Sequence, residues 1–127
     1  VDDMRRFHTD PRSELTPFVM RAVSDARAAA QAAGTWTADD EAAFTHLSSG
    51  EPEFTPTSAW AVLFSAVVTS LTRHTWDELI IPGEDRRIAT PGQMLLVMLL
   101  RDPTNAWWDD RRTGDATETR DAIVLRT

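Results

Sequence analysis

Apolar residues recur at helical spacing along most of the chain, and this pattern predicts helices separated by short polar breaks. The clearest segment begins at Thr16-Pro17, a threonine cap followed by a proline in the first helical turn. It ends at Gly34, a residue typical of a helix C-terminus. The side chains on its predicted inward face are mostly small, which predicts close approach to a neighbouring helix. These residues, the small stripe, are Val19, Val23, Ala26, Ala30 and Ala33.

Three more helices are expected in the first two thirds of the chain. Residues 1–8 form a short one, which Asp10-Pro11 breaks. A second is capped by Thr37, has acidic residues in its first turn, and turns Phe44 and Leu47 inward. After a loop over residues 48–56, the longest helix opens at Thr57 or Ser58 and extends toward Trp76 and Leu79. Its apolar face is formed by Trp60, Phe64, Val67, Val68 and Leu71.

The last third combines one strongly apolar helix with an irregular segment. Pro82-Gly83 ends the long helix, and Thr90-Pro91 repeats the cap-and-proline signal before residues 93–100. Those eight residues are almost wholly apolar, which predicts a helix buried on all sides. After an irregular stretch over residues 102–112, Asp115 and Glu118 form a capping-box pattern before a helix with Ala122, Ile123 and Leu125. Strand signals are nearly absent, so the sequence predicts an all-α, irregular bundle of about five to six helices, one unit over residues 1–127.

Composition and charge exclude several classes of function. The net charge is -7, and all 13 basic residues are arginine against 20 acidic ones, so no basic face gathers for nucleic acid. There is no cysteine, which excludes disulfides, thiolate zinc sites and a cysteine nucleophile. Residues 54–72 carry no charge, but a proline, several hydroxyl residues and a one-sided stripe argue against a membrane span.

The residues that could carry chemistry give little support for an active site. His8, His46 and His74 lie on different predicted helices without a second histidine at helical spacing, so we expect no metal and no other cofactor. The carboxylate pairs fit first-turn charges and solvated faces better than general acid–base catalysis: Asp2-Asp3, Asp39-Asp40, Asp77-Glu78 and Asp109-Asp110. No serine elbow and no glycine-rich phosphate loop is present. We therefore assign no catalytic residue.

The adjacent tryptophans are the conspicuous feature. Trp107 and Trp108, followed by Asp109 and Arg111, are the candidate packing or interface residues of the chain. The favoured interpretation is that one tryptophan fixes the irregular segment to the core while the other is half covered. The alternative is an exposed docking patch.

The order of three motifs resembles the β-chain of the penicillin amidase family. The first is residues 1–23, where a short helix with spaced aspartates leads through Ser13 and Leu15 to the helix beginning at Pro17. The second is residues 57–71, with small residues before Leu63-Phe64. The third joins a proline–tryptophan segment to an Arg-Asp-aliphatic helix through Pro103, Trp107, Trp108, Arg120, Asp121 and Ile123.

The resemblance implies a specific chemistry for the parent protein. Members of the family are N-terminal nucleophile hydrolases with an αββα sandwich, made by self-cleavage of a precursor into two chains. A serine at the new β-chain terminus attacks an amide carbonyl of an N-acyl substrate, such as a β-lactam side chain, and its own α-amino group acts as base. None of that machinery maps here, because Val1 is no nucleophile and Asn105 lies in the tryptophan segment. The resemblance places the chain in the helical middle of the β-chain, with the rest of the hydrolase as its partner. Family members are often exported, but the chain itself indicates no compartment.

Two other hypotheses stay open. The chain begins at Val1 and ends within an amphipathic pattern, so we expect a piece of a larger hydrolase that is inactive alone. A stand-alone all-α protein-interaction module is the alternative, and a small metal-dependent helical enzyme built on the three histidines is the third.

Overall fold

The fold is all-α, as the hydrophobic spacing predicts. The computed structural model describes residues 11–81, 83–84, 88–89, 91–114 and 118–127. Within them lie α2 (Thr16–Ala33), α3 (Ala38–Ser49), α4 (Ala59–Thr75), α5 (Gln93–Leu100) and α6 (Arg120–Leu125), with a short 3-10 helix, η1 (Asp77–Leu79), after α4. Over this described part no strand forms, and Arg12 and Glu53 make an isolated antiparallel bridge. The helix predicted over residues 1–8 lies outside the described residues.

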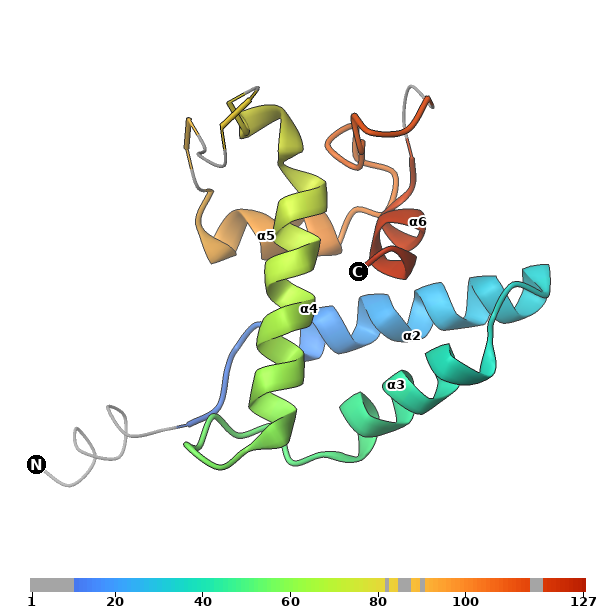
Figure 1. Ribbon diagram of the computed structural model, residues 1–127, viewed down its shortest axis with the longest axis vertical. Helices are drawn as coiled ribbons and strands as arrows, with labels where there is room; N and C mark the ends of the chain where they lie inside the picture. Colours follow the sequence, from blue (N-terminus) through green and yellow to red (C-terminus); the bar gives the residue numbers. More distant parts are fainter. Residues whose placement is uncertain (1–10, 82, 85–87, 90, 115–117) are drawn as a thin grey trace, which may run out of the picture.

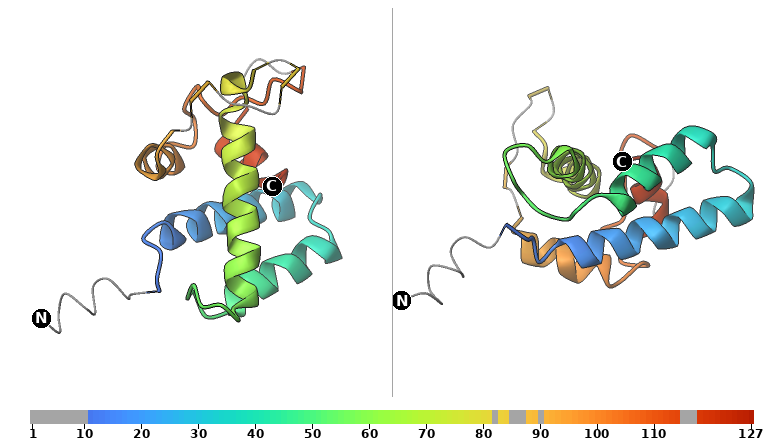
Figure 2. Two further views of the ribbon diagram at one scale, coloured as in Figure 1. Left: turned by 60° about the vertical axis from the view of Figure 1, so that its left-hand side comes forward. Right: turned by 90° about the horizontal axis from the view of Figure 1, so that it is seen from below.

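Helices α2 and α4 run in different directions, and α6 contacts both of them. α4 runs along the long axis of the molecule, while α2 and α3 run side by side across its direction (Figure 1). α2 contacts α5 and, most extensively, α6, whereas α4 contacts α3 and α6. Figure 2 shows the same arrangement from two further directions. The C-terminal helix is thus enclosed between α2 and α4.

The core joins side chains from α2, α3, α4, α5 and α6 with Trp108 of the irregular segment, and Leu15 and Trp76 beside α2 and α4 belong to it as well. Its largest fully buried apolar members are Trp108, Phe64, Leu71, Leu96, Ile123 and Val19. The small stripe of α2 is buried through Ala22, Ala26 and Ala30. The predicted close approach is confirmed, since α6 lies against this helix.

Enlarging the small stripe is expected to destabilise the fold. Ala26 is 1% exposed, so leucine at this position would overpack the core and lower the free energy of unfolding by about 1–3 kcal/mol. Ala28 is exposed on the same helix, and A28L should change stability by less than about 0.5 kcal/mol. Urea denaturation of both variants tests this. Equal effects at the two positions would contradict the packing of α6 on the stripe.

Two of the predicted caps are confirmed and three were wrong. Thr37 caps α3 in a capping box with Asp40, and Ser58 caps α4 by accepting a hydrogen bond from the N–H of Ala61. Helix α2, however, already has helical backbone at Leu15, so Thr16 lies inside the helix and caps nothing. Helices α5 and α6 begin later than predicted, after Gly92 and Thr119, both of which have extended backbone. Thr90 and Asp115, the caps predicted for them, lie outside the described residues.

The long helix ends earlier than its apolar pattern suggested. α4 stops at Thr75, because Trp76 leaves the helical region with φ -127° and ψ 44°. The chain then continues as η1 rather than as an extension of α4. Of Pro82-Gly83, the predicted end, the proline lies outside the described residues and Gly83 has a positive φ of 80°.

The prediction that residues 93–100 are buried on all sides was wrong. Leu96 and Leu100 are buried, but Met94, Leu95 and Met98 are 71%, 51% and 60% exposed. The physical reason is that α5 packs against its neighbours along one face only. The described part of the chain places nothing over its outer face.

None of the helices that the structure describes is long and apolar enough to cross a membrane. The uncharged stretch over residues 54–72 divides between a loop and α4, and Trp60 stacks on Phe64 while Phe54 meets both rings edge-on.

Candidate functional site

The irregular segment after α5 is fixed to the core by Trp108. This side chain is 0% exposed, and its indole Nε1–H donates a 2.7 Å hydrogen bond to the carbonyl of Asp102. Its backbone N–H donates to the carbonyl of Asn105, and its carbonyl accepts from the N–H of Glu118. Burial with a satisfied indole N–H is how a tryptophan contributes to a core. Trp108 therefore joins parts of the segment on both sides of residues 109–113, through its ring to Asp102 and through its backbone carbonyl to Glu118.

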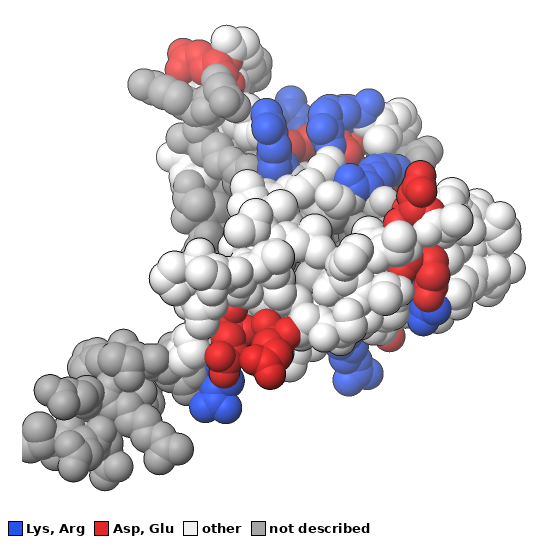
Figure 3. Space-filling model, turned by 60° about the horizontal axis from the view of Figure 1, so that its bottom comes forward, with Lys and Arg blue, Asp and Glu red and all other residues white. Residues whose placement is uncertain are grey.

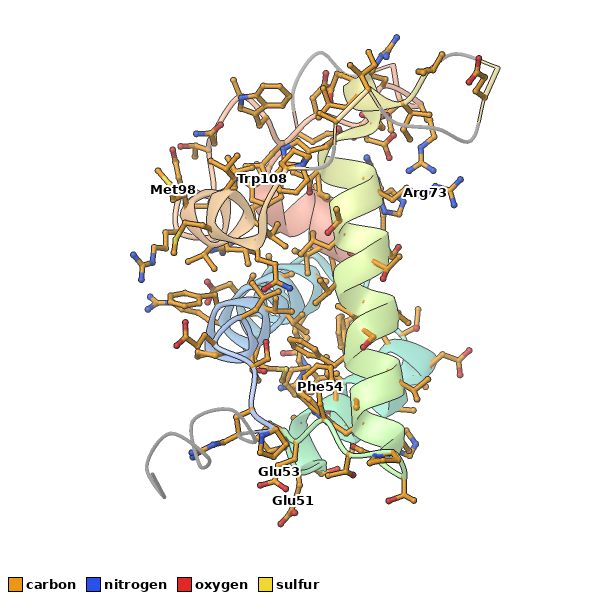
Figure 4. The ribbon with its side chains drawn as sticks, turned by 90° about the vertical axis from the view of Figure 1, so that its left-hand side faces the viewer. Glu51, Glu53, Phe54, Arg73, Met98 and Trp108 are labelled. Atoms are coloured by element: carbon orange, nitrogen blue, oxygen red, sulfur yellow. The ribbon has the colours of Figure 1, made fainter. Side chains whose placement is uncertain are left out.

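Trp107 lies on the other side of the backbone and is 47% exposed. Its ring lines a shallow cavity of 330 Å³ together with Leu95, Met98, Trp76 and Asn105. In Figure 4, Trp108 lies on the inner side of α5 and Met98 on the outer side. The structure thus separates the two tryptophans: one is in the core, and the other borders the uncovered face of α5.

Asp109 and Arg111 do not converge with the tryptophans on one patch. Asp109 is half-buried, and the Arg111 side chain is exposed. The backbone N–H of Arg111 donates a 3.0 Å hydrogen bond to Oδ2 of Asp77, which ties the segment to η1. An interface role for these four residues stays a prediction.

The sequence reasoning missed Asp110, which is the centre of the local electrostatics. It was expected on a solvated face, but it is 2% exposed. Arg112 donates to it from Nε and Nη2, both at 2.7 Å, and from its backbone N–H at 3.1 Å. These charge-assisted hydrogen bonds from Arg112 lower the pKa of Asp110 to about 2. The run Asp-Asp-Arg-Arg could have indicated this pairing, because an arginine can hydrogen-bond to an acidic side chain two residues earlier and so close a turn.

Asp77 and Glu78 were also expected on a solvated face, but neither side chain is fully exposed to solvent. Asp77 is buried at 9% exposure, and within the part of the chain that the structure describes, its Oδ1 and the buried Oε2 of Glu78 have no hydrogen-bond partner. Burial raises the pKa of Asp77, and it raises the pKa of Glu78 as well. Figure 3 shows basic and acidic side chains close together at the end of the molecule where α4 ends. Asp2-Asp3 lies outside the described residues, whereas Asp39-Asp40 is exposed in the first turn of α3 as expected.

Residues 1–127 match the model of the family described as penicillin amidase. The chain belongs to the penicillin amidase family. No curated protein and no solved structure gives a significant match.

In this penicillin amidase segment, the residues of the third motif form one packing unit. The N–H of Arg120 donates to the carbonyl of Pro103 at 3.0 Å, and its Nε donates to Asp121 at 2.8 Å. Trp108 and Ile123 are both fully buried. The proline–tryptophan segment and the Arg-Asp-aliphatic helix are therefore joined by direct contacts.

The histidines of the amidase chain lie apart as far as they are described. His46 is exposed on α3, and Nδ1 of His74 lies 2.8 Å from the carbonyl of Ser70 on α4; His8 lies outside the described residues. Among the residues with described positions, no group of three or more histidine and acidic side chains could hold a metal ion. The expectation that the chain carries no cofactor stays a prediction.

Asp110 predicts an acid-dependent loss of stability. The pKa of Asp110 is about 2 in the folded state, below its usual 3.8. The pairing with Arg112 therefore stabilises the fold above pH 3.8, and this stabilisation is lost as the pH falls through about 2. D110N is expected to lower the free energy of unfolding by about 2 kcal/mol at pH 7, and the difference should vanish near pH 2. Urea denaturation across this pH range measures it.

Asp77 supplies the matched control, because its raised pKa has the opposite sign. Its stabilising contribution is present at low pH and is lost as pH rises through the raised folded-state pKa. D77N should therefore equal or exceed the parent chain in stability at pH 7, since an amide oxygen can still accept from Arg111. A pH-independent deficit in D110N would contradict the assignment.

Proposed function

We propose that these residues are a helical packing segment of a penicillin amidase–type hydrolase that cleaves linear amide bonds of N-acyl substrates. The observation that carries the proposal is the match of the family over residues 1–127. The nucleophile of the parent enzyme, an N-terminal serine, lies on residues other than these. The segment supports the sandwich that carries the chemistry, and its partner is the remainder of the amidase.

The joined contacts of the third motif support this assignment. A segment that serves as a scaffold needs a core that fixes its own shape, and Trp108, Arg120 and Ile123 provide one across α5, α6 and the irregular segment. The uncovered face of α5 is consistent with a surface that other parts of an amidase cover. Its large exposed apolar side chains would otherwise face water.

The purified 127-residue chain is expected to release no amine from phenylacetyl or long-chain acyl amides. The intact product of the gene should hydrolyse at least one such amide under the same conditions. Clear turnover by the 127-residue chain would overturn the scaffold proposal, and an inactive intact product would overturn the assignment to an N-acyl amide hydrolase.

A stand-alone interaction module is the second candidate, favoured by the same exposed residues of α5 and by Trp107. The flanking DNA distinguishes the two. The amidase proposal expects an open reading frame that continues on both sides, with a serine codon at a processing junction upstream. An initiator codon directly before Val1 and a stop codon directly after Thr127 would favour the module.

A further inference from the structure

A cleft of 650 Å³ lies between the start of α2, the end of α5 and the start of α6. Its size falls within the range of small-ligand sites, roughly 300–1,000 Å³. Three guanidinium groups line it, from Arg21, Arg101 and Arg120, beside apolar surface from Phe18, Leu100 and Pro103. It is separate from the cluster around Asp110 and from the outer face of α5.

Arg120 is the buried arginine among the residues that line this cleft, and it is already engaged. Its side chain is 7% exposed, and Nη2 bonds Asp25 at 2.8 Å and Asp121 at 2.7 Å. Nη1 donates to the carbonyl of Leu100 at 2.9 Å. Asp25, the carboxylate in the described lining of the cleft, is therefore held by this buried arginine, as is Asp121 of α6.

Arg21 and Arg101 are different, because neither has a carboxylate partner among the described residues. Arg21 is exposed one turn after Phe18 on α2. Arg101 is exposed at the C-terminus of α5, and its Cζ lies 4.6 Å from the centre of the Phe18 ring. Stacking on an aromatic face leaves the in-plane N–H groups of a guanidinium free to donate. Among the residues that line the cleft, three arginines stand against one carboxylate, Asp25, so the lining carries excess positive charge in a chain of net charge -7.

Other arginines of the chain do pair with carboxylates. Arg27 pairs with Glu41, Arg112 with Asp110, and Arg126 with Glu118. Acidic residues outnumber arginines by 20 to 13, so a shortage of acids does not explain why two guanidinium groups on one cleft have no carboxylate partner among the described residues. A guanidinium donates parallel hydrogen bonds to a carboxylate, and the apolar wall suits a hydrocarbon body.

We propose that this cleft binds an organic carboxylate with a small apolar body, held by Arg21 and Arg101 and packed against Phe18 and Leu100. The proposal is independent of the amidase function, since no residue of the cleft is assigned to catalysis. A ligand of this class would have its carboxylate at the two exposed arginines and its hydrocarbon part against Phe18 of α2 and Leu100 of α5.

Sodium benzoate is the probe, titrated into the ¹⁵N-labelled 127-residue chain at constant ionic strength and neutral pH. Saturable shifts are expected for the amide signals of Phe18, Arg21 and Leu100. R21Q and R101Q should each weaken binding about tenfold, as expected for a lost charge-assisted hydrogen bond. R111Q is the matched control, because Arg111 is also exposed but does not line the cleft, and it should bind benzoate like the parent chain.

Two further ligands complete the test. Benzamide has the same ring without the charge and should bind at least tenfold more weakly. Inorganic phosphate has charge without the ring and should not displace benzoate at equal concentration. The proposal is overturned by equal binding of benzamide, by effective displacement with phosphate, by unchanged affinity in R21Q and R101Q, or by an equal loss in R111Q.

Discussion

Replacing Trp108 with alanine is expected to lower the free energy of unfolding by about 3–5 kcal/mol. The ring is 0% exposed, so its removal leaves a large cavity where α5, α6 and the irregular segment meet. It also leaves the carbonyl of Asp102 without its indole donor. The loss is a large fraction of the stability of an ordinary domain. Urea denaturation followed by circular dichroism measures it.

The neighbouring tryptophan is the natural control. Trp107 has the same side chain one residue earlier but is 47% exposed, so W107A should cost less than about 1 kcal/mol. W108F separates the contribution of ring packing from that of the indole hydrogen bond, because phenylalanine retains most of the side-chain volume but has no N–H donor. The assignment of Trp108 to the core would be wrong if W107A and W108A were equally destabilising.

Features determined by neighbouring residues could be predicted from the sequence. The Thr37–Asp40 capping box needs only four consecutive residues, and Ser58 caps α4 through a residue three positions later. The small stripe of α2 also predicted a close neighbour correctly. Such signals are local because a cap satisfies backbone groups within the first turn.

Features that depend on distant contacts could not be predicted. Thr16 is a local exception: it looked like a cap, but the turn from Ser13 to Thr16 makes Leu15 helical first. Asp77 looked solvated, yet its carboxylate accepts from the backbone of Arg111, 34 residues away. Hydrophobic spacing shows that a residue prefers burial but not whether a partner covers it. This is why α5 was expected to be enclosed and exposes Met94 and Met98.

The candidate site shows the same division. The favoured interpretation, in which one tryptophan lies in the core and the other is half covered, is confirmed; which of the two is buried follows only from the fold, with Trp108 0% and Trp107 47% exposed. The cleft with Arg21 and Arg101 was invisible in the sequence, because its walls come from segments about 80 residues apart. Only the arrangement of α2 against α5 and α6 brings these arginines to one place.

Replacing Arg120 with methionine is expected to lower the free energy of unfolding by about 3 kcal/mol. Methionine keeps an unbranched apolar side chain, so the main loss is electrostatic. The carbonyl of Leu100 loses its donor, and Asp25 and Asp121 lose the cation between them. These contacts join α6 to both α2 and α5, so hydrogen exchange should speed up first in α6. Thermal denaturation and amide exchange measure the two effects.

R27M is the matched control for this prediction. Arg27 also makes a two-bond contact with a carboxylate, since its Nε and Nη2 donate to Glu41 at 2.9 and 2.8 Å. Its side chain is 30% exposed and that of Glu41 is 42% exposed, so the pair is screened by water and its loss should cost about 1 kcal/mol or less. Equal losses in R27M and R120M would mean that burial does not distinguish the two pairs. R120K should recover little of the loss, because one ammonium nitrogen cannot reproduce the planar spread of Nε, Nη1 and Nη2, which reach Asp121, Leu100 and Asp25 separately.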